Sequence, residues 1–369
     1  MEMEKMIELI DAVSKSDLTG FKYEEEGIKL HLSKRENTCY VTENLSAPVN
    51  AVTTSAAEIK KAAEGDQISG TSAEEIPVGN VVESPLVGTF YAAPAEDAES
   101  FVKVGDRVAL EPGKTCGHCE FCKEGKYNLC PDVEFFATPP VDGVFQEYVA
   151  HEAGLCFKLP DNVSTLEGAL IEPLAVGFHA AIQGDAHLGQ KAVVMGAGCI
   201  GLVSMMALKA RGVTEVYVVD IMEKRLEKAL ELGATGVING AKEDVAARIK
   251  ELTAGKGADL VIETAGSEIT TRQAIQITKK GATIVLVGYS KTGEVTLPMS
   301  IALDKELTFK TVFRYRHIYP MAIDAVASGK VNLKGIVTDI FDLDDVQKAM
   351  DYSIHNKAEI VKGVIKIHG

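Results

Sequence analysis

Short apolar runs alternate with helix-forming segments over the second half of the chain. An apolar helical segment at 202–210 follows the first run. Strands that alternate with helices in this way are typical of a parallel sheet covered by helices on both faces. The pattern therefore predicts an α/β fold whose doubly wound sheet lies within residues 181–310. The apolar runs predicted as strands are 191–195, 215–220, 259–263 and 283–288.

The first hundred residues show a different pattern. Apolar residues recur at helical spacing near the N-terminus, and they alternate along 21–24 and 28–32. These features predict a helix and a hairpin over residues 1–35. Residues 36–78 are rich in Ala, Ser, Thr, Glu and Val with little periodicity, which is typical of a flexible linker.

Four cysteines stand close together in the sequence, at Cys116, Cys119, Cys122 and Cys130. Zinc binds cysteine sulfur at about 2.3 Å, and four thiolates complete its tetrahedral shell without an open position for substrate. A disulfide cluster is the alternative, but in a chain without secretory features this spacing is more often metal-binding. We therefore predict a structural zinc site. His118 is not expected to be a ligand, because four sulfurs already satisfy the metal.

A glycine turn, Gly196-Ala-Gly198-Cys-Ile200-Gly201, joins the predicted strand 191–195 to the apolar helix. In such a turn the glycines permit the sharp bend, the approach of a pyrophosphate and close packing of helix on strand. The helix N-terminus favours the negative charge of the pyrophosphate. Asp220 follows at the end of the next strand, where a carboxylate would accept hydrogen bonds from ribose hydroxyls. This combination predicts a dinucleotide site that takes NAD rather than NADP.

Several further motifs follow one another along the chain. They are Val104-Gly-Asp-Arg-Val108, the four cysteines, Phe135-Phe-Ala-Thr-Pro-Pro140, Ile171-Glu-Pro-Leu-Ala175 and Phe313-Arg-Tyr315. These motifs occur in the order found in the zinc-dependent medium-chain dehydrogenases, and they most closely resemble the sorbitol and xylitol (polyol) dehydrogenases. The resemblance covers about residues 102–369. It implies a partial GroES-like catalytic domain over 102–180, a Rossmann NAD-binding domain over 181–310 and a C-terminal return to the catalytic domain over 311–369.

The resemblance implies oxidation of a secondary alcohol, with hydride passing from a zinc-bound substrate to the nicotinamide ring. Glu172 matches the family's glutamate at the catalytic metal, with a helix-start carboxylate as the alternative. Arg314 and Tyr315 match a pair beside the substrate hydroxyls, and a plain surface residue is the alternative for Arg314. Arg225 matches an arginine near the adenosine end of the cofactor, and a solvated helix arginine is its alternative.

Four other residues are expected to line the pocket or to support the structure. Phe136 and Thr138 are expected to line the substrate pocket by the same resemblance. His151 and His179 are expected to be structural.

The catalytic zinc is the weak point of the resemblance. The family's Gly-x-Cys-Gly and Gly-His-Glu motifs do not occur in the chain. Catalytic zinc sites usually have three protein ligands and one open position. With Glu172 as the only matching residue, we expect one structural zinc, a doubtful catalytic zinc and impaired turnover.

Residues 1–108 resemble the biotin carboxyl carrier protein of acetyl-CoA carboxylase, with a truncated biotinyl-like segment at 79–108. No Ala-Met-Lys triplet occurs in the chain, so biotin is not expected. The resemblance leaves two alternatives to the dehydrogenase. One is a carrier subunit in fatty acid biosynthesis that contacts biotin carboxylase, and the other is a non-functional or artefactual fusion of two sequences.

The charge of the chain limits its partners. Most of the formal net charge of −15 lies in residues 1–100, and such acidity disfavours nucleic acid and anionic membrane surfaces. No apolar run is long enough to span a membrane and no cationic signal peptide is present, so we expect a cytoplasmic protein. The resemblance implies a small polyol or other secondary alcohol as substrate. It also implies a homo-oligomer, with residues 297–313 as the candidate surface.

Overall fold

The computed structural model describes residues 20–25, 28–33, 100 and 102–367. The predicted N-terminal helix, the linker and most of the biotinyl-like segment lie outside these residues. The chain divides into two compact units, Met1–Ser84 and Pro85–Gly369. In the first unit, β1 (Gly20–Glu25) pairs with β2 (Ile28–Ser33) in antiparallel register, Gly20 opposite Ser33, so the strands of the predicted hairpin are present.

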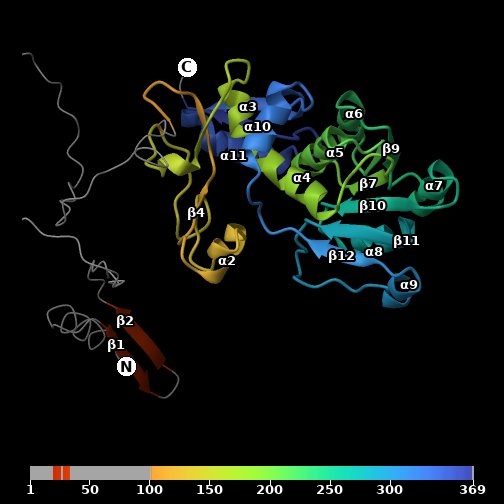
Figure 1. Cartoon of the computed structure of the whole chain (residues 1–369), viewed down its shortest axis with the longest axis horizontal. Helices are drawn as coiled ribbons and strands as arrows, with labels where there is room; N and C mark the ends of the chain where they lie inside the picture. The colour runs from red at the N-terminus through yellow and green to blue at the C-terminus, as the bar shows by residue number, and fades with distance from the viewer. Residues whose placement is uncertain (1–19, 26–27, 34–99, 101, 368–369) are drawn as a thin grey trace, which may run out of the picture. The chain divides into compact units, whose positions relative to one another are not determined.

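The second unit is built on a six-stranded, wholly parallel sheet with the strand order β12-β11-β10-β7-β8-β9 (Figure 1). The sequence pattern predicted four of these strands, and the structure starts the predicted strand 283–288 earlier, at Thr278. The short strands β9 and β12 were missed because four residues carry little periodicity. The six strands are β7 (Lys191–Met195), β8 (Glu215–Asp220), β9 (Gly236–Asn239), β10 (Ala258–Glu263), β11 (Thr278–Leu286) and β12 (Thr308–Thr311).

Helices cover both faces of this sheet because alternate strand residues point to opposite sides. In β7, Ala192 and Val194 join one apolar cluster, whereas Val193 and Met195 join the other. The first cluster packs against α4 (Ile171–Gln183), α5 (Cys199–Ala210), α6 (Glu223–Glu231) and α10 (Tyr319–Ala327). The second packs against α7 (Val245–Leu252), α8 (Glu268–Ile277) and α9 (Met299–Asp304).

Short strand pairs and helices precede the sheet. The strand β3 (Val108–Leu110) pairs antiparallel with β6 (Cys156–Lys158), and β4 (Gly113–Lys114) pairs antiparallel with β5 (Glu134–Phe135). Three short helical segments lie between these strands: α2 (Glu120–Lys123), η2 (Tyr127–Leu129) and η3 (Ala153–Leu155). The helix α3 (Thr165–Ala169) follows, and a Ser164/Glu167 capping box closes its N-terminus.

The C-terminal residues form a smaller layer that packs back onto the first part of this unit. The Tyr319 hydroxyl at the start of α10 donates to the Leu110 carbonyl at 2.8 Å, which joins β3 to a helix 209 residues later. The described strand nearest the chain's end is β14. The remaining elements are η4 (Lys334–Ile336), β13 (Asp339–Asp342), η5 (Leu343–Asp345), α11 (Val346–His355) and β14 (Gly363–Lys366), which pairs parallel with β13.

Candidate dinucleotide site, metal centre and alcohol pocket

The glycine turn after β7 has the geometry that its sequence predicts. Gly196 has a φ of +102°, and a Cβ there would come within 2.9 Å of the Thr264 hydroxyl oxygen. A Cβ at Gly201 would lie 1.9 Å from the Gly196 carbonyl oxygen. Only glycine fits either position, so the turn can bring its backbone and the start of α5 close to a ligand.

The predicted cofactor residues line one cavity of about 680 Å³ at the carboxyl ends of the strands. Seven other described residues line the cavity and are not predicted from the sequence, because nothing in the chain's local pattern marks them. The predicted lining residues are Gly196, Gly198, Ile200, Gly201, Asp220 and Arg225, and the additional ones include Thr264, Ala265, Lys291 and Lys357.

Asp220 holds the glycine turn as well as facing the cavity. One carboxylate oxygen accepts a hydrogen bond from the Ala197 amide at 2.7 Å. The other accepts from the Ile221 and Met222 amides at 2.8 and 2.9 Å. Each carboxylate oxygen can accept more than one hydrogen bond, so the group keeps acceptor capacity for ribose hydroxyls.

Arg225 connects the cavity to the C-terminal part of the chain. Its Nη2 donates to the Lys357 carbonyl at 2.7 Å. Its Nε is buried and has no hydrogen-bond partner among the described residues. Neighbouring Lys224 also pairs with Glu359. The arginine is thus a partly buried cation held at the cavity by the Lys357 carbonyl.

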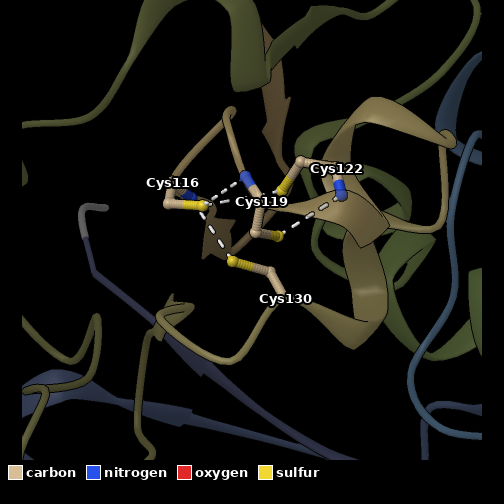
Figure 2. Close-up of side chains that lie close together, drawn as sticks. All are labelled: Cys116, Cys119, Cys122 and Cys130. Carbon is tan, nitrogen blue, oxygen red and sulfur yellow. Dashed lines mark hydrogen bonds between the residues drawn. The ribbon is translucent and has the colours of Figure 1, made fainter.

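The four cysteines of the predicted zinc site converge (Figure 2), with all four Sγ atoms within 4.8 Å of one another. Cys116 and Cys122 Sγ atoms lie 4.0 Å apart, close to the separation of two thiolates on one tetrahedral zinc ion. Amides of the loop point at the sulfurs, as where the Cys119 amide donates to Cys116 at 3.3 Å. The backbone amides of His118 and Cys119 lower the pKa of the Cys116 thiol to about 6, which favours the thiolate.

The cluster fits a structural zinc ion. All four cysteines are free thiols, so the structure contains no disulfide among them. The ring of His118 hydrogen-bonds to the Cys116 carbonyl at 2.7 Å and is not part of the sulfur cluster. The donor set is therefore four sulfurs, as the spacing predicted.

Glu172 lies in the first turn of α4 at the edge of a second cavity, of about 490 Å³. Burial raises the pKa of its carboxyl group, and the nearby Tyr315 hydroxyl and Lys362 oppose this shift. Phe135, Phe136 and Val144 line the same cavity, as does Leu110. The cavity is mostly apolar, and among the described residues that line it Glu172 is the one with a charged side chain.

Arg314 and Tyr315 differ in where they lie. Tyr315 is buried near Glu172, and its hydroxyl has no hydrogen bond of normal geometry within the described part of the chain. The Arg314 guanidinium stacks over the Phe135 ring, 4.1 Å from its centroid, and its Nη1 is buried without a partner in that same part. The structure thus brings Tyr315 to Glu172, and it places Arg314 against an aromatic wall of the cavity rather than on the open surface.

The other candidate residues divide in the same way. Phe136 lines the cavity beside Glu172, whereas Thr138 is not among the residues that line it. His151 hydrogen-bonds to the Glu111 carbonyl at 2.8 Å, and His179 is buried in α4 at 4% exposure, so both occupy structural positions.

A second metal centre at Glu172 does not follow from the described residues. Among them, the four-cysteine cluster is the one group of three or more His, Cys, Asp or Glu side chains close enough to hold a metal ion. Within the described part of the chain, the ligand set of a catalytic zinc is therefore not met at Glu172.

Comparison with known proteins settles the family. The description "Zinc-binding dehydrogenase" matches residues 199–328, and "Alcohol dehydrogenase GroES-like domain" matches residues 48–161. The zinc-type alcohol dehydrogenase-like protein YdjJ of Escherichia coli is 50% identical over 266 residues, which are 72% of this chain and 76% of YdjJ. The chain belongs to the zinc-type alcohol dehydrogenase family. Its Rossmann-like sheet and GroES-like domain are the fold of that family, and the protein is an oxidoreductase.

Other known proteins are also similar to this chain. Sorbitol dehydrogenase of Bacillus subtilis is 41% identical and covers 78% of this chain and 83% of its own. A solved E. coli oxidoreductase of unknown specificity is 49% identical with a TM-score of 0.71, covering 73% of this chain and 77% of its own. An E. coli alcohol dehydrogenase solved with NADH is 29% identical with a TM-score of 0.68, covering 74% and 80%.

These matches bear on two other expectations. The GroES-like match starts at residue 48, within the stretch that we assigned to a linker and a biotinyl-like segment. The resemblance to a biotin carboxyl carrier protein finds no support in the comparisons or in the structure.

No helix in the described part of the chain is long and apolar enough to cross a membrane.

Proposed function

We propose that this chain is an NAD-binding, zinc-containing dehydrogenase that oxidises a polyol or another secondary alcohol by hydride transfer. The observation that carries the proposal is the cavity that joins the glycine turn to Asp220. Asp220 favours NAD because its carboxylate would repel the additional phosphate of NADP. The relatives named for sorbitol support a polyol as substrate.

The chain's own residues have separate roles in this proposal. The turn at Gly196–Gly201 and the N-terminus of α5 would bind the pyrophosphate, and Asp220 would accept hydrogen bonds from the adenosine ribose. When bound, NAD supplies the hydride acceptor. The apolar cavity beside Glu172 would exclude water from the alcohol carbon, and Glu172 with Tyr315 would orient the hydroxyl groups.

The metal chemistry is limited to the four-cysteine cluster. Cys116, Cys119, Cys122 and Cys130 would hold one structural zinc ion, which stabilises the loop and leaves no position open for substrate. Impaired turnover stays a prediction, since Glu172 does not belong to a metal-binding group in the described residues. Self-association through residues 297–313 and a cytoplasmic location also stay predictions.

The first test is cofactor selection. We expect the purified chain to bind NADH at least tenfold more tightly than NADPH, measured by nicotinamide fluorescence. Asp220→Asn replaces the carboxylate with an uncharged amide, and we expect it to weaken NADH binding about tenfold, the cost of one or two charge-assisted hydrogen bonds. The ratio of the Kd for NADPH to the Kd for NADH should fall at the same time. Equal affinities for NADH and NADPH in the unsubstituted chain would contradict the proposal.

The control is Asp324→Asn, an exposed residue of α10 that does not line the cofactor cavity. It should bind both cofactors as the unsubstituted chain does. Turnover with NAD is then measured on sorbitol, xylitol and 2,3-butanediol. Cofactor binding with turnover near background would support a dinucleotide-binding chain with an incomplete alcohol site.

A further inference from the structure

A buried glutamate lies behind the cofactor cavity, outside the residues considered so far. Glu263 is the last residue of β10 and is 1% exposed. Its Oε1 accepts hydrogen bonds from the Ala265 amide at 3.0 Å, the Gly266 amide at 3.0 Å and the Thr270 hydroxyl at 2.8 Å. Burying a carboxylate costs free energy unless hydrogen-bond donors replace the water that it loses. The three donors supply that replacement for Glu263.

The two amide donors belong to one short loop, residues 264–266, which with the cap residue Ser267 joins β10 to α8. With the Ala265 and Gly266 amides turned toward Glu263, the loop has a single backbone orientation. Thr270 lies in the first turn of α8, and its hydroxyl ties that helix to the same carboxylate. The glutamate therefore connects the end of a core strand, a loop and the start of a helix.

The loop is also enclosed by its neighbours. On one side, the Thr264 hydroxyl donates to the Met195 carbonyl at 2.8 Å, directly before the glycine turn. On the other side, a Cβ at Gly288 would lie 2.3 Å from the Gly266 amide nitrogen. Such close approaches on both sides leave little room for an alternative loop conformation.

This loop forms one wall of the cofactor cavity, through Thr264 and Ala265. Asp220 forms part of the opposite wall, because β8 and β10 lie on either side of β7. A dinucleotide lies across the point where the strand order reverses, with its two halves on either side. If Asp220 holds the adenosine ribose, the loop 264–266 faces the nicotinamide half.

We propose that Glu263, together with Thr270, is a positioning residue for the nicotinamide half of the dinucleotide. It acts through the loop 264–266 and does not touch the cofactor itself. The inference rests on the proposed NAD site and adds to it a residue that neither the motifs nor the resemblance marked. Loss of the hydrogen bonds to this carboxylate should shift the loop that faces the nicotinamide and leave the wall at the adenosine end in place.

Two ligands separate the two halves of the site. NADH binding is measured by fluorescence and ADP binding by titration calorimetry, both on the full chain. Glu263→Gln replaces one carboxylate oxygen with an NH2 group, which cannot accept a hydrogen bond from the backbone N–H groups of the loop. We therefore expect the Kd for NADH to rise about tenfold. The Kd for ADP should stay within about twofold, since ADP meets only the Asp220 side.

Thr270 supplies variants that leave the buried charge in place. Thr270→Val removes the hydroxyl but keeps the Thr270 backbone amide that caps α8 on Ser267. We expect a three- to fivefold rise in the Kd for NADH from the loss of the hydroxyl's hydrogen bonds to Glu263 and Ser267, and Thr270→Ser should restore the original value. Glu268→Gln is the matched control, because that carboxylate is exposed and pairs with Arg272 on the same helix.

The outcomes are distinct. If the unsubstituted chain binds neither NADH nor ADP, the proposed cofactor site itself fails. If it binds both, and Glu263→Gln and Thr270→Val bind NADH as tightly as the unsubstituted chain, the positioning role is wrong. An equal loss of NADH and ADP binding would also overturn it, because the effect would then be a general loss of structure.

Discussion

At the scale of single residues, burial sets the chemistry of several ionisable groups. Burial raises the pKa of the Glu172 and Glu263 carboxyl groups, since a charged carboxylate loses its hydration inside the protein. It lowers the pKa of His179 to about 4, with the nearby Arg316 charge acting in the same direction. Because folding changes the pKa of each of these side chains, their titration is coupled to folding.

His179 gives the clearest pH dependence. Its folded pKa of about 4 lies below the ordinary value of 6.5, so below pH 6.5 the unfolded chain binds a proton that the folded chain does not. Its contribution to stability is complete above pH 6.5 and is lost as the pH falls toward 4. Between pH 7 and pH 5 we expect about 2 kcal/mol of the unfolding free energy to be lost through this group.

Urea unfolding at the two pH values measures this effect. In His179→Gln the difference in unfolding free energy between pH 7 and pH 5 should shrink by about that amount. The control is His187→Gln, because His187 is exposed and should leave the difference unchanged. Parallel pH profiles for the unsubstituted chain and His179→Gln would contradict the assignment.

At the scale of elements, the packing of α4 on α5 positions both cavities. The helix α4 carries Glu172 near its start, and α5 begins at the glycine turn. The two helices meet at Gly177, where a Cβ would lie 2.8 Å from the Val203 carbonyl oxygen. That contact is with backbone, which cannot move aside as a flexible side chain could.

We therefore expect Gly177→Ala to destabilise the protein by about 2 kcal/mol, the usual cost of overpacking a close core contact. The gain in helix propensity from glycine to alanine, up to about 1 kcal/mol, offsets only part of the steric cost. Urea midpoints measure the change. Gly154→Ala is the matched control, because its Cβ would have no atom within 4 Å. A midpoint for Gly177→Ala at or above that of the unsubstituted chain would show that the helices can separate at little cost.

At the scale of the whole unit, the four-cysteine lobe supports a segment almost 190 residues away. The Asn128 side chain donates to the Phe313 carbonyl at 2.8 Å, and the His317 amide donates to the Tyr127 hydroxyl at 2.7 Å. The supported segment carries Arg314 and Tyr315. A metal ion that holds the lobe would thus also hold one wall of the alcohol pocket.

Removal of the metal should loosen that wall and leave the cofactor side unchanged. We expect one zinc ion per chain, lost in Cys122→Ser or after chelation, and faster amide hydrogen exchange in residues 313–317. Exchange at the Ala197 amide and the Kd for NADH should not change. Cys156→Ser is the control, because its sulfur lies outside the cluster. Unchanged zinc content in Cys122→Ser would rule out the four-sulfur site.

Much of this architecture could be predicted because its signals are local. The strand runs 191–195 and 215–220, the glycine turn and the four cysteines each concentrate their information within a short stretch. The hydrophobic period, the space available to a Cβ and the tetrahedral geometry of zinc then determine the structure. In the four-residue strands β9 and β12, the apolar pattern is too short to identify a strand from the sequence. Residues 1–19 and 34–99 lie outside the described structure, so the expectations there stay predictions.

Other features depended on contacts that no local pattern specifies. Glu172 and Tyr315 meet although they lie 143 positions apart in the sequence, and Lys357 reaches the cofactor cavity from near the C-terminal end of the chain. Glu263 reads in the sequence as the polar end of a strand, and only the folded structure reveals the three donors that converge on its carboxylate. Local sequence determines which segments become strands, turns and metal loops, because neighbouring residues decide backbone conformation. Which buried groups face one another was decided by the packing of distant segments, since burial and pairing exist only once the core has formed.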